Sequence, residues 1–312
     1  MTVKTKIDEL LELYNLPIQD LINIANKITR ENFENKIEFC SIISAKTGRC
    51  GENCKYCSQS VYYDTFISSH PLISIEKVKK AALSAKENGA TRFCVVTSGK
   101  NPSAKDFDEI LKMIETVASI KGLNSCCSLG ILEENQILQL KKAGLKRYNH
   151  NLNTCKSYYN QICTTHSYED RINTVKLIQS HGIESCTGGI IGMGETRKQR
   201  VELALELAEL NPVSVPINFL IPIKGTPLEK YYNAIDEDEI LKTLAIFRIT
   251  LPKALIRYAG GRSSRLSKKY QELGIKAGVN ALLVGNYLTT TGISLEEDLE
   301  LIKNNEMDLV KC

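Results

Sequence analysis

Short apolar segments alternate with amphipathic segments along most of the chain. We predict a strand wherever an apolar run is brief and rich in β-branched or aromatic residues. These runs lie at residues 37–44, 92–99, 124–130, 147–153, 184–192, 214–222, 255–261 and 280–288. Apolar residues at helical spacing fill most of the intervals, at 74–90, 106–122, 133–144, 168–182, 200–210 and 236–247. Four of these helical segments end at a glycine, as helices commonly do: Gly89, Gly122, Gly144 and Gly182.

This alternation predicts an α/β fold, a (βα)8 TIM-type barrel with an N-terminal helical extension. Strand–helix units of roughly 30 residues follow one another without a linker-like or low-complexity stretch. We expect a helical segment at 1–35 and one barrel at 36–312. An open, doubly wound sheet is the alternative.

The predicted strands carry polar and thiol side chains that a strand buried on both faces would not need. In a parallel barrel the C-terminal ends of the strands face a shared pocket. We therefore expect a polar barrel interior at that end. The residues concerned are Cys94, Cys126, Asn151, Asn153, Cys186, Asn218 and Arg257.

Charge and hydropathy exclude several classes of function. The chain of 312 residues has 40 Lys and Arg against 36 Asp and Glu, so its net charge of +4 is slight. Because it has no basic block, we expect no binding to nucleic acid. The N-terminus is charged and amphipathic, unlike a signal peptide, and no apolar run reaches about 18 residues. We expect no membrane association and a soluble, cytoplasmic protein.

Eleven cysteines are more than packing requires. An odd number without an export signal argues against a disulfide scaffold. Reduced thiols then serve as small core residues or as metal ligands. We interpret four of them as core residues: Cys40, Cys155, Cys163 and Cys312.

Three further cysteines lie within eight positions, spaced C-x₃-C-x₂-C at Cys50, Cys54 and Cys57. A zinc site usually pairs two such halves and needs a fourth ligand, and no second half is present. Three thiols suit a 4Fe–4S cluster in which one iron has no protein ligand and can bind a small molecule. Structural zinc or chance spacing is the alternative.

This motif, with Tyr56 before its last cysteine, resembles that of the radical S-adenosylmethionine (SAM) enzymes. The resemblance implies that the open iron binds SAM and that an electron from the cluster cleaves it to a 5′-deoxyadenosyl radical. It also implies that Tyr56 lies near the adenine.

Six further segments make the chain similar to the biotin synthase family along nearly its whole length. The resemblance implies conversion of dethiobiotin to biotin, a flavodoxin- or ferredoxin-type electron donor and a homodimer. The segments are RFCVVTSGKNP (92–102), SCCSLGIL (125–132), YNHNLNT (148–154), SCTGGIIGMGET (185–196), VPINFLIPIKGTPL (215–228) and IRYAGGR (256–262).

The resemblance also implies an auxiliary iron–sulfur cluster, expected to be 2Fe–2S, that donates the sulfur. Its ligands fall on Cys94, Cys126, Cys186 and Arg257. Cys127 is an additional thiol, but neighbours in a strand point to opposite faces, so we predict Cys126 as the ligand. If both pointed inward, a larger cluster could form.

Binding residues are implied in the same way. For SAM they are Tyr56, Ser98, Asn151, Asn153, Arg171, Ile190 and Gly192, and for dethiobiotin Asn151 and Asn218. Asn153 departs from the family, in which many members have aspartate, so the carboxylate charge is missing there. The catalytic set comprises Cys50, Cys54, Cys57 and Arg257.

Two alternatives remain open. The chain could be another radical SAM barrel enzyme, of the hydrogenase-maturation or methylornithine-forming type. It could also be a non-catalytic iron–sulfur or zinc protein that senses redox state.

Overall fold

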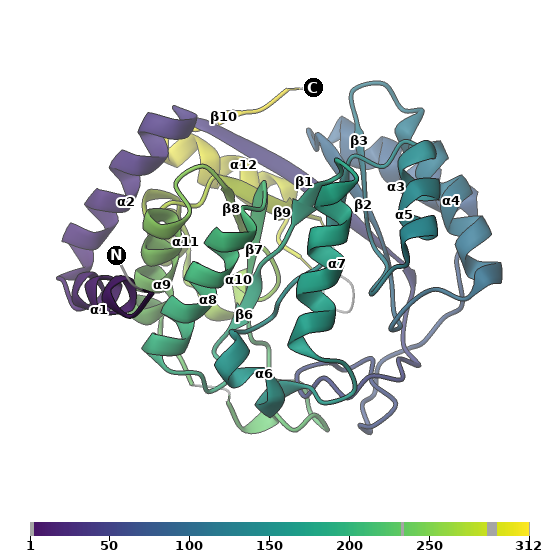
Figure 1. Cartoon of the computed structure of the whole chain (residues 1–312). Helices are drawn as coiled ribbons and strands as arrows, with labels where there is room; N and C mark the ends of the chain where they lie inside the picture. Colours follow the sequence, from purple (N-terminus) through teal and green to yellow (C-terminus); the bar gives the residue numbers. More distant parts are fainter. Residues whose placement is uncertain (1–2, 232–233, 286–291, 312) are drawn as a thin grey trace.

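The computed structural model describes residues 3–231, 234–285 and 292–311. Parallel strands close into a barrel in the order β1-β2-β3-β4-β5-β7-β8-β9, and β9 pairs with β1. The helices lie around the outside (Figure 1). The predicted (βα)8 barrel is therefore confirmed, and the open sheet is excluded. The barrel strands are β1 (Lys36–Lys46), β2 (Arg92–Thr97), β3 (Asn124–Ser128), β4 (Arg147–Asn149), β5 (Glu184–Cys186), β6 (Gly189–Ile191), β7 (Ser214–Phe219), β8 (Leu255–Tyr258) and β9 (Ala281–Val284).

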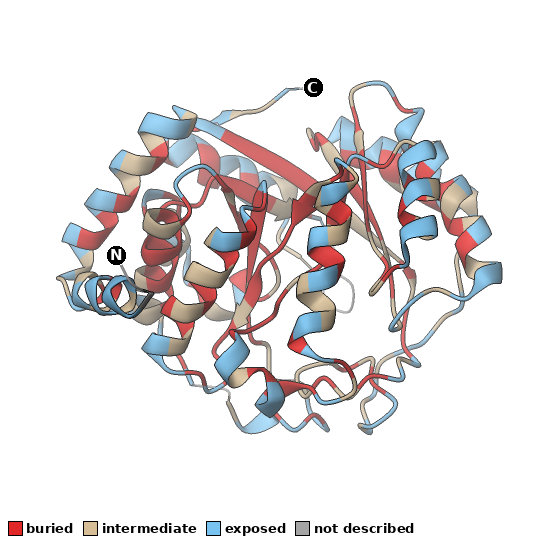
Figure 2. Ribbon diagram, in the orientation of Figure 1, coloured by how far each residue is buried: buried red, intermediate tan, exposed pale blue. Residues whose placement is uncertain are grey.

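Each predicted amphipathic segment overlaps a helix, and the helices at 156–162, 262–265, 268–276 and 295–304 were not predicted. The helices bury their apolar faces toward the barrel (Figure 2). Ser74 and Ser103 cap two of them, each accepting a hydrogen bond from a backbone N–H of the first turn. The helices that surround the barrel are α3 (Ile75–Glu87), α4 (Ala104–Ala118), α5 (Glu134–Lys142), α6 (Lys156–Ile162), α7 (Tyr168–Ser180), α8 (Arg197–Leu210), α9 (Glu237–Thr250), α10 (Arg262–Arg265), α11 (Lys268–Lys276) and α12 (Leu295–Asn304), with a short 3₁₀ turn η1 (Glu229–Tyr231).

The fifth predicted strand, 184–192, is divided into β5 and β6, because β6 pairs with β7 after a break at 187–188. Gly188 explains the break. A Cβ at this position would lie 1.9 Å from the carbonyl oxygen of Pro216, so only glycine allows the two backbones to approach. A short strand that was not predicted, β10 (Asp308–Leu309), pairs with the start of β1.

The predicted N-terminal helical segment forms α1 (Val3–Tyr14) and α2 (Ile18–Phe33). α1 packs against α8 and α9, and α2 packs against α9. Buried polar contacts fix this packing, since the Tyr14 hydroxyl lies 2.6 Å from the Thr243 hydroxyl and accepts a hydrogen bond from Arg200 Nε at 3.1 Å. Among the described residues, no helix is both long enough and apolar enough to cross a bilayer.

Candidate functional site

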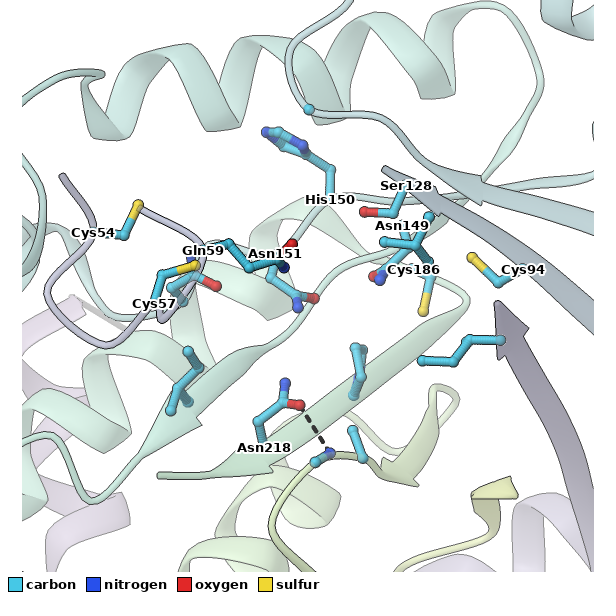
Figure 3. Close-up of a pocket in the computed structure, with 18 of the residues that line it drawn as sticks. Cys54, Cys57, Gln59, Cys94, Ser128, Asn149, His150, Asn151, Cys186 and Asn218 are labelled. Carbon is cyan, nitrogen blue, oxygen red and sulfur yellow. Dashed lines mark hydrogen bonds between the residues drawn. The ribbon is translucent and has the colours of Figure 1, made fainter. Parts of the chain in front are cut away.

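A cavity of about 460 Å³ opens at the C-terminal end of the barrel. Its volume lies in the range of pockets that hold small molecules and cofactors. Cysteines from the 47–61 loop line one part of it, and cysteines from the barrel strands line another (Figure 3). The structure therefore brings both predicted thiol sets into one cavity.

The first thiol set lies on the loop that follows β1. Cys50, Cys54 and Cys57 all line the cavity, and backbone hydrogen bonds fix the loop between them. The backbone amide of Cys57 donates to the carbonyl oxygen of Cys54 at 2.9 Å. The backbone amide of Cys50 donates to the carbonyl oxygen of Gln59, also at 2.9 Å. Burial raises the pKa of Cys57 to about 11, so this thiol needs a cation nearby to lose its proton.

Cys54 has a neighbour that the sequence did not reveal. Its thiol lies 3.6 Å from the sulfur of Cys163, which also contacts His166 Nδ1 at 3.4 Å. A hydrogen bond from Cys54 is the main cause that lowers the pKa of Cys163 to about 3. His166 in turn pairs with Glu52, and both line the cavity. We had interpreted Cys163 as a core residue, and it is buried, but it contacts a proposed cluster ligand.

The second thiol set lies on the inner wall of the barrel. Cys94 of β2 is in register with Cys126 of β3, and Cys186 of β5 is in register with Asn149 of β4. All three cysteines line the cavity, and Cys94 interacts electrostatically with both Cys126 and Cys186. Burial raises the pKa of Cys126 to about 12 and that of Cys94 well above its usual value.

Two other cysteines test the predictions for this wall. Cys127 is fully buried and packs in the hydrophobic core, away from the cavity, as alternation along a strand predicts. Cys40 differs from its interpretation as a core residue. It lines the cavity together with Cys94, Cys126 and Cys186, and it lies outside the hydrophobic core cluster that contains Cys127.

Charged side chains lie on the same inner wall. Glu38 pairs with Arg92 at 2.9 Å, with Arg147 at 3.0 Å and with Arg257. Burial alone would raise the pKa of Glu38, but Arg257, Arg147 and Arg92 lower it to about 2. Arg257 also donates to the carbonyl of Leu282 at 3.2 Å.

This wall has more positive than negative charge. Two buried guanidinium groups, of Arg147 and Arg257, and the partly buried one of Arg92 face one buried carboxylate. The second carboxylate near them, Glu184, has a side chain that is 40% exposed. Arg92 Nη1 is buried without a hydrogen-bond partner among the described residues. Buried cations and unpaired donors are unfavourable unless an anion accompanies them. The donor set therefore fits an anionic group, such as an iron–sulfur cluster with thiolate ligands.

The predicted asparagines lie between the two thiol sets. Asn151 Oδ1 accepts from the amide of Gly188 at 3.0 Å, and Asn218 Oδ1 accepts from the amide of Gly260 at 2.9 Å (Figure 3). Asn153 is buried with φ 70°, a left-handed conformation that asparagine tolerates. All three line the cavity.

Arg171 and Tyr56 also line the cavity. Arg171 donates to the Tyr159 hydroxyl at 2.7 Å and to the carbonyl of Asn151 at 2.8 Å, and its Nη2 lies 2.7 Å from His166 Nε2. These contacts hold the guanidinium beside the 47–61 loop.

Of the remaining predicted residues, one lines the cavity, and the others make hydrogen bonds next to it. Ile190 lines the cavity, whereas Ser98 and Gly192 do not. The Ser98 hydroxyl instead donates to the carbonyl of Gly48 at 2.7 Å and so holds the 47–61 loop. The amide of Gly192 donates to Glu195 at 2.8 Å.

Sequence reasoning missed four residues of the site: Cys40, Glu38, Glu52 and His166. In the segment IEFCSIIS, both alternating faces carry apolar and polar residues. The pattern therefore does not reveal that Glu38 and Cys40 point inward. Glu52 lies between Cys50 and Cys54 in the sequence, so its closeness to the cysteine motif could have been noted. No signal in the sequence links it to His166.

Comparison with known proteins agrees with this geometry. Residues 45–207 match the radical SAM superfamily, and residues 216–308 match the biotin and thiamin synthesis associated domain. The chain is 46% identical to a biotin synthase of Acetivibrio thermocellus over 97% of this chain and 94% of that protein. It is 45% identical to one of Clostridium perfringens, with the same coverage of each chain.

Solved structures share the fold at low identity. Methylornithine synthase superposes with a TM-score of 0.83 at 20% identity, covering 97% of this chain and 94% of that one. The FeFe-hydrogenase maturase HydG from Carboxydothermus hydrogenoformans superposes with a TM-score of 0.79 at 18% identity, covering 99% of this chain and 79% of that one. At these identities the likeness concerns the barrel alone.

Proposed function

Because the chain belongs to the biotin synthase family of radical SAM enzymes, we propose that it binds SAM and dethiobiotin in the barrel cavity and converts dethiobiotin to biotin. Membership makes it a radical SAM sulfurtransferase that uses a 4Fe–4S cluster and SAM. The family also implies an auxiliary cluster, for which we propose the 2Fe–2S type. When bound, the first cluster supplies the electron that cleaves SAM, and the second supplies sulfur.

We assign the 4Fe–4S cluster to Cys50, Cys54 and Cys57. Their sulfur atoms line one side of the cavity on a loop fixed by its own backbone hydrogen bonds. Burial raises the pKa of Cys57 to about 11, so this thiol is protonated at neutral pH without iron. Iron binding therefore releases protons, and the three thiolates leave one iron open to SAM.

We assign the auxiliary cluster to Cys94, Cys126 and Cys186, and the family pattern adds Arg257. The support for this assignment is the shared cavity and the surplus of buried guanidinium charge around it. A cluster in this position is sealed from the helices by the barrel wall.

For SAM we propose contacts with Tyr56, Asn153, Arg171 and Ile190, which line the cavity near the 47–61 loop. Ser98 would act through backbone, because its neighbours Thr97 and Gly99 line the cavity. Gly192, which lies two residues after the cavity-lining Ile190, would also act through backbone. We keep Asn151 as a contact to both SAM and substrate.

Asn218 is the proposed contact to the ureido ring of dethiobiotin. Its Oδ1 already accepts from Gly260, and its Nδ2 donates to the carbonyl of Gly189 at 3.2 Å, so the amide orientation is fixed. An asparagine can present a donor and an acceptor to one edge of a ureido ring. The barrel around the cavity would keep solvent away from the reacting carbon atoms of dethiobiotin.

One observation carries the proposal: a single cavity is lined by two separate sets of thiols, with asparagines between them. A redox sensor with one cluster does not need the second set. The hydrogenase-maturation and methylornithine-forming enzymes share the barrel, but the relatives at 45–46% identity over most of the chain are biotin synthases.

Three further assignments remain proposals. We propose a flavodoxin- or ferredoxin-type electron donor, a homodimer in the cytoplasm, and a division into a helical segment 1–35 and a barrel unit 36–312.

The test is anaerobic reconstitution with iron and sulfide, followed by addition of SAM, a reductant and dethiobiotin. We expect both 5′-deoxyadenosine and biotin. If neither forms although iron is bound, the proposed function is wrong. If 5′-deoxyadenosine forms with a different substrate only, the chain is another kind of radical SAM enzyme.

A further inference from the structure

The inner wall of the barrel holds one more thiol than the family pattern requires. Among the ten cysteines that the structure describes, eight are buried, and four of these, Cys54, Cys127, Cys155 and Cys163, belong to the hydrophobic core cluster. The other four stand outside that cluster, and all of them line the cavity: Cys40, Cys94, Cys126 and Cys186. Cys54, on the 47–61 loop, belongs to the core cluster and also lines the cavity, whereas Cys127, Cys155 and Cys163 do not line it.

Strand register fixes the direction of Cys40. Glu38, Cys40 and Ile42 lie on one face of β1, because residues two apart share a face. Glu38 bonds to guanidinium groups inside the barrel, and Ile42 lines the cavity, so Cys40 between them also points inward. Ile42 is in register with Cys94, which places Cys40 two residues from the level of a proposed ligand.

Electrostatic neighbours give the same picture. Cys40 interacts with Arg257 and Cys186, and both Cys94 and Cys126 interact with Cys40. Cys127 interacts with Cys94 and Cys126 as well, but it packs in the hydrophobic core and does not line the cavity.

Arg257 is already engaged. Its Nη2 pairs with Glu38 and lies 3.5 Å from the Ser214 hydroxyl, and its Nη1 donates to the carbonyl of Leu282. Guanidinium resists deprotonation, so it would have to leave an ion pair and lose a proton to bind iron. A thiol becomes a good iron ligand once it loses its proton, and cysteine thiolates are the ordinary ligands of iron–sulfur clusters.

We propose that Cys40 is the fourth thiolate ligand of the auxiliary cluster. Arg257 then keeps its ion pair with Glu38 and compensates the negative charge of the cluster from beside it. The inference rests on the proposed function, because it assumes that the barrel holds a second cluster. It deepens that function by naming a ligand that the family pattern does not include.

The test uses a full-length background variant without the first cluster, in which Cys50, Cys54 and Cys57 are replaced by Ala. Cys40→Ser is added to this background, and Cys127→Ser serves as the matched control, because Cys127 is also buried but faces the core. After anaerobic reconstitution, iron and sulfide per chain are measured, and Mössbauer spectra are recorded. Far-UV circular dichroism verifies that each variant is folded.

We expect the background variant to retain inner iron. Cys40→Ser should lower that iron at least about twofold or replace the spectrum by one with an oxygen ligand, whereas Cys127→Ser should change neither. If Cys40→Ser keeps the iron content and the spectrum of the background, the inference is wrong and the auxiliary cluster stands. If the background itself binds no iron, the auxiliary cluster of the proposed function is refuted as well.

A second measurement needs no variant. In the reduced wild-type protein, pulsed electron paramagnetic resonance detects nitrogen bound to iron. With four thiolate ligands, we expect no strong coupling to a guanidinium nitrogen at the auxiliary cluster. A strong coupling of this kind would mean that Arg257 is a ligand, and would overturn the assignment of Cys40.

Discussion

The 47–61 loop and the inner wall of the barrel present thiols in two different ways. On the loop, three cysteines are close in sequence, and backbone hydrogen bonds between neighbouring residues determine their positions. On the wall, the cysteines come from four strands, and the register between strands determines their positions. Local backbone hydrogen bonds therefore position the thiols of the loop, whereas the pairing of the barrel strands positions the thiols of the wall.

The two regions also differ in charge. The wall contains the buried Arg147 and Arg257 and the partly buried Arg92 around the buried Glu38. The loop has Arg171 and the pair of Glu52 and His166 at its edge. The excess positive charge of the wall therefore favours an anionic group there, whereas the loop leaves space for a ligand that exchanges.

Loss of one thiol in each region should therefore give different results, and this is the largest expected effect. Cys57→Ala should lower formation of both 5′-deoxyadenosine and biotin by at least about 10³-fold, because SAM cleavage needs the loop cluster. Cys186→Ala should lower biotin by about 10²-fold or more but keep 5′-deoxyadenosine within about threefold. Both products are measured in one anaerobic assay.

Cys127→Ala is the control for this pair, since it removes a buried thiol without changing the cavity. A Cys186→Ala enzyme that stops forming 5′-deoxyadenosine would show that the two regions are not independent. A Cys57→Ala enzyme that still forms it would remove Cys57 from the cluster.

The buried ion pairs of the wall give the second effect, on stability. In the full-length chain without iron, Glu38→Gln leaves three guanidinium groups without their shared carboxylate and should cost about 3 kcal/mol of unfolding free energy. The partly exposed Glu184, replaced by Gln, should cost less than about 1 kcal/mol. Urea titration at pH 7 measures both.

The pH dependence sharpens this test. The pKa of Glu38 is lowered from 4.5 to about 2 in the folded chain. The stabilisation by its carboxylate is therefore fully present above pH 4.5 and is lost as the pH falls toward 2. Unfolding free energies of wild type and Glu38→Gln should converge across this range. A constant difference between them would show that the carboxylate charge is not what stabilises the wall.

The same contrast explains what the sequence could predict. The loop motif lies in one short window, so Cys50, Cys54 and Cys57 were identified from spacing alone. Alternation along β3 correctly separated Cys126 from Cys127. Each of the eight predicted segments overlaps a barrel strand, but 184–192 is divided into β5 and β6, and the end of 280–288 lies outside the described residues.

Other features depend on three-dimensional packing. Cys40 was interpreted as a core residue because each face of β1 carries both apolar and polar residues, and periodicity then gives no direction. The break between β5 and β6 follows from a close approach of Gly188 to Pro216, residues 28 positions apart in the chain. The contact of Cys163 with Cys54 joins segments 109 residues apart, and no local pattern encodes it.

The smallest expected effect concerns the link between the two regions. Ser98 follows β2 of the wall, and its hydroxyl donates to Gly48 at the start of the loop at 2.7 Å. Ser98→Ala should lower the unfolding free energy by about 1 kcal/mol, the value of one such hydrogen bond, and raise the KM for SAM about threefold with little change in kcat. Ser180→Ala is the control, because its hydroxyl makes an exposed hydrogen bond within a helix end. A change in kcat without a change in KM would mean that Ser98 acts on the reaction rather than on the position of the loop.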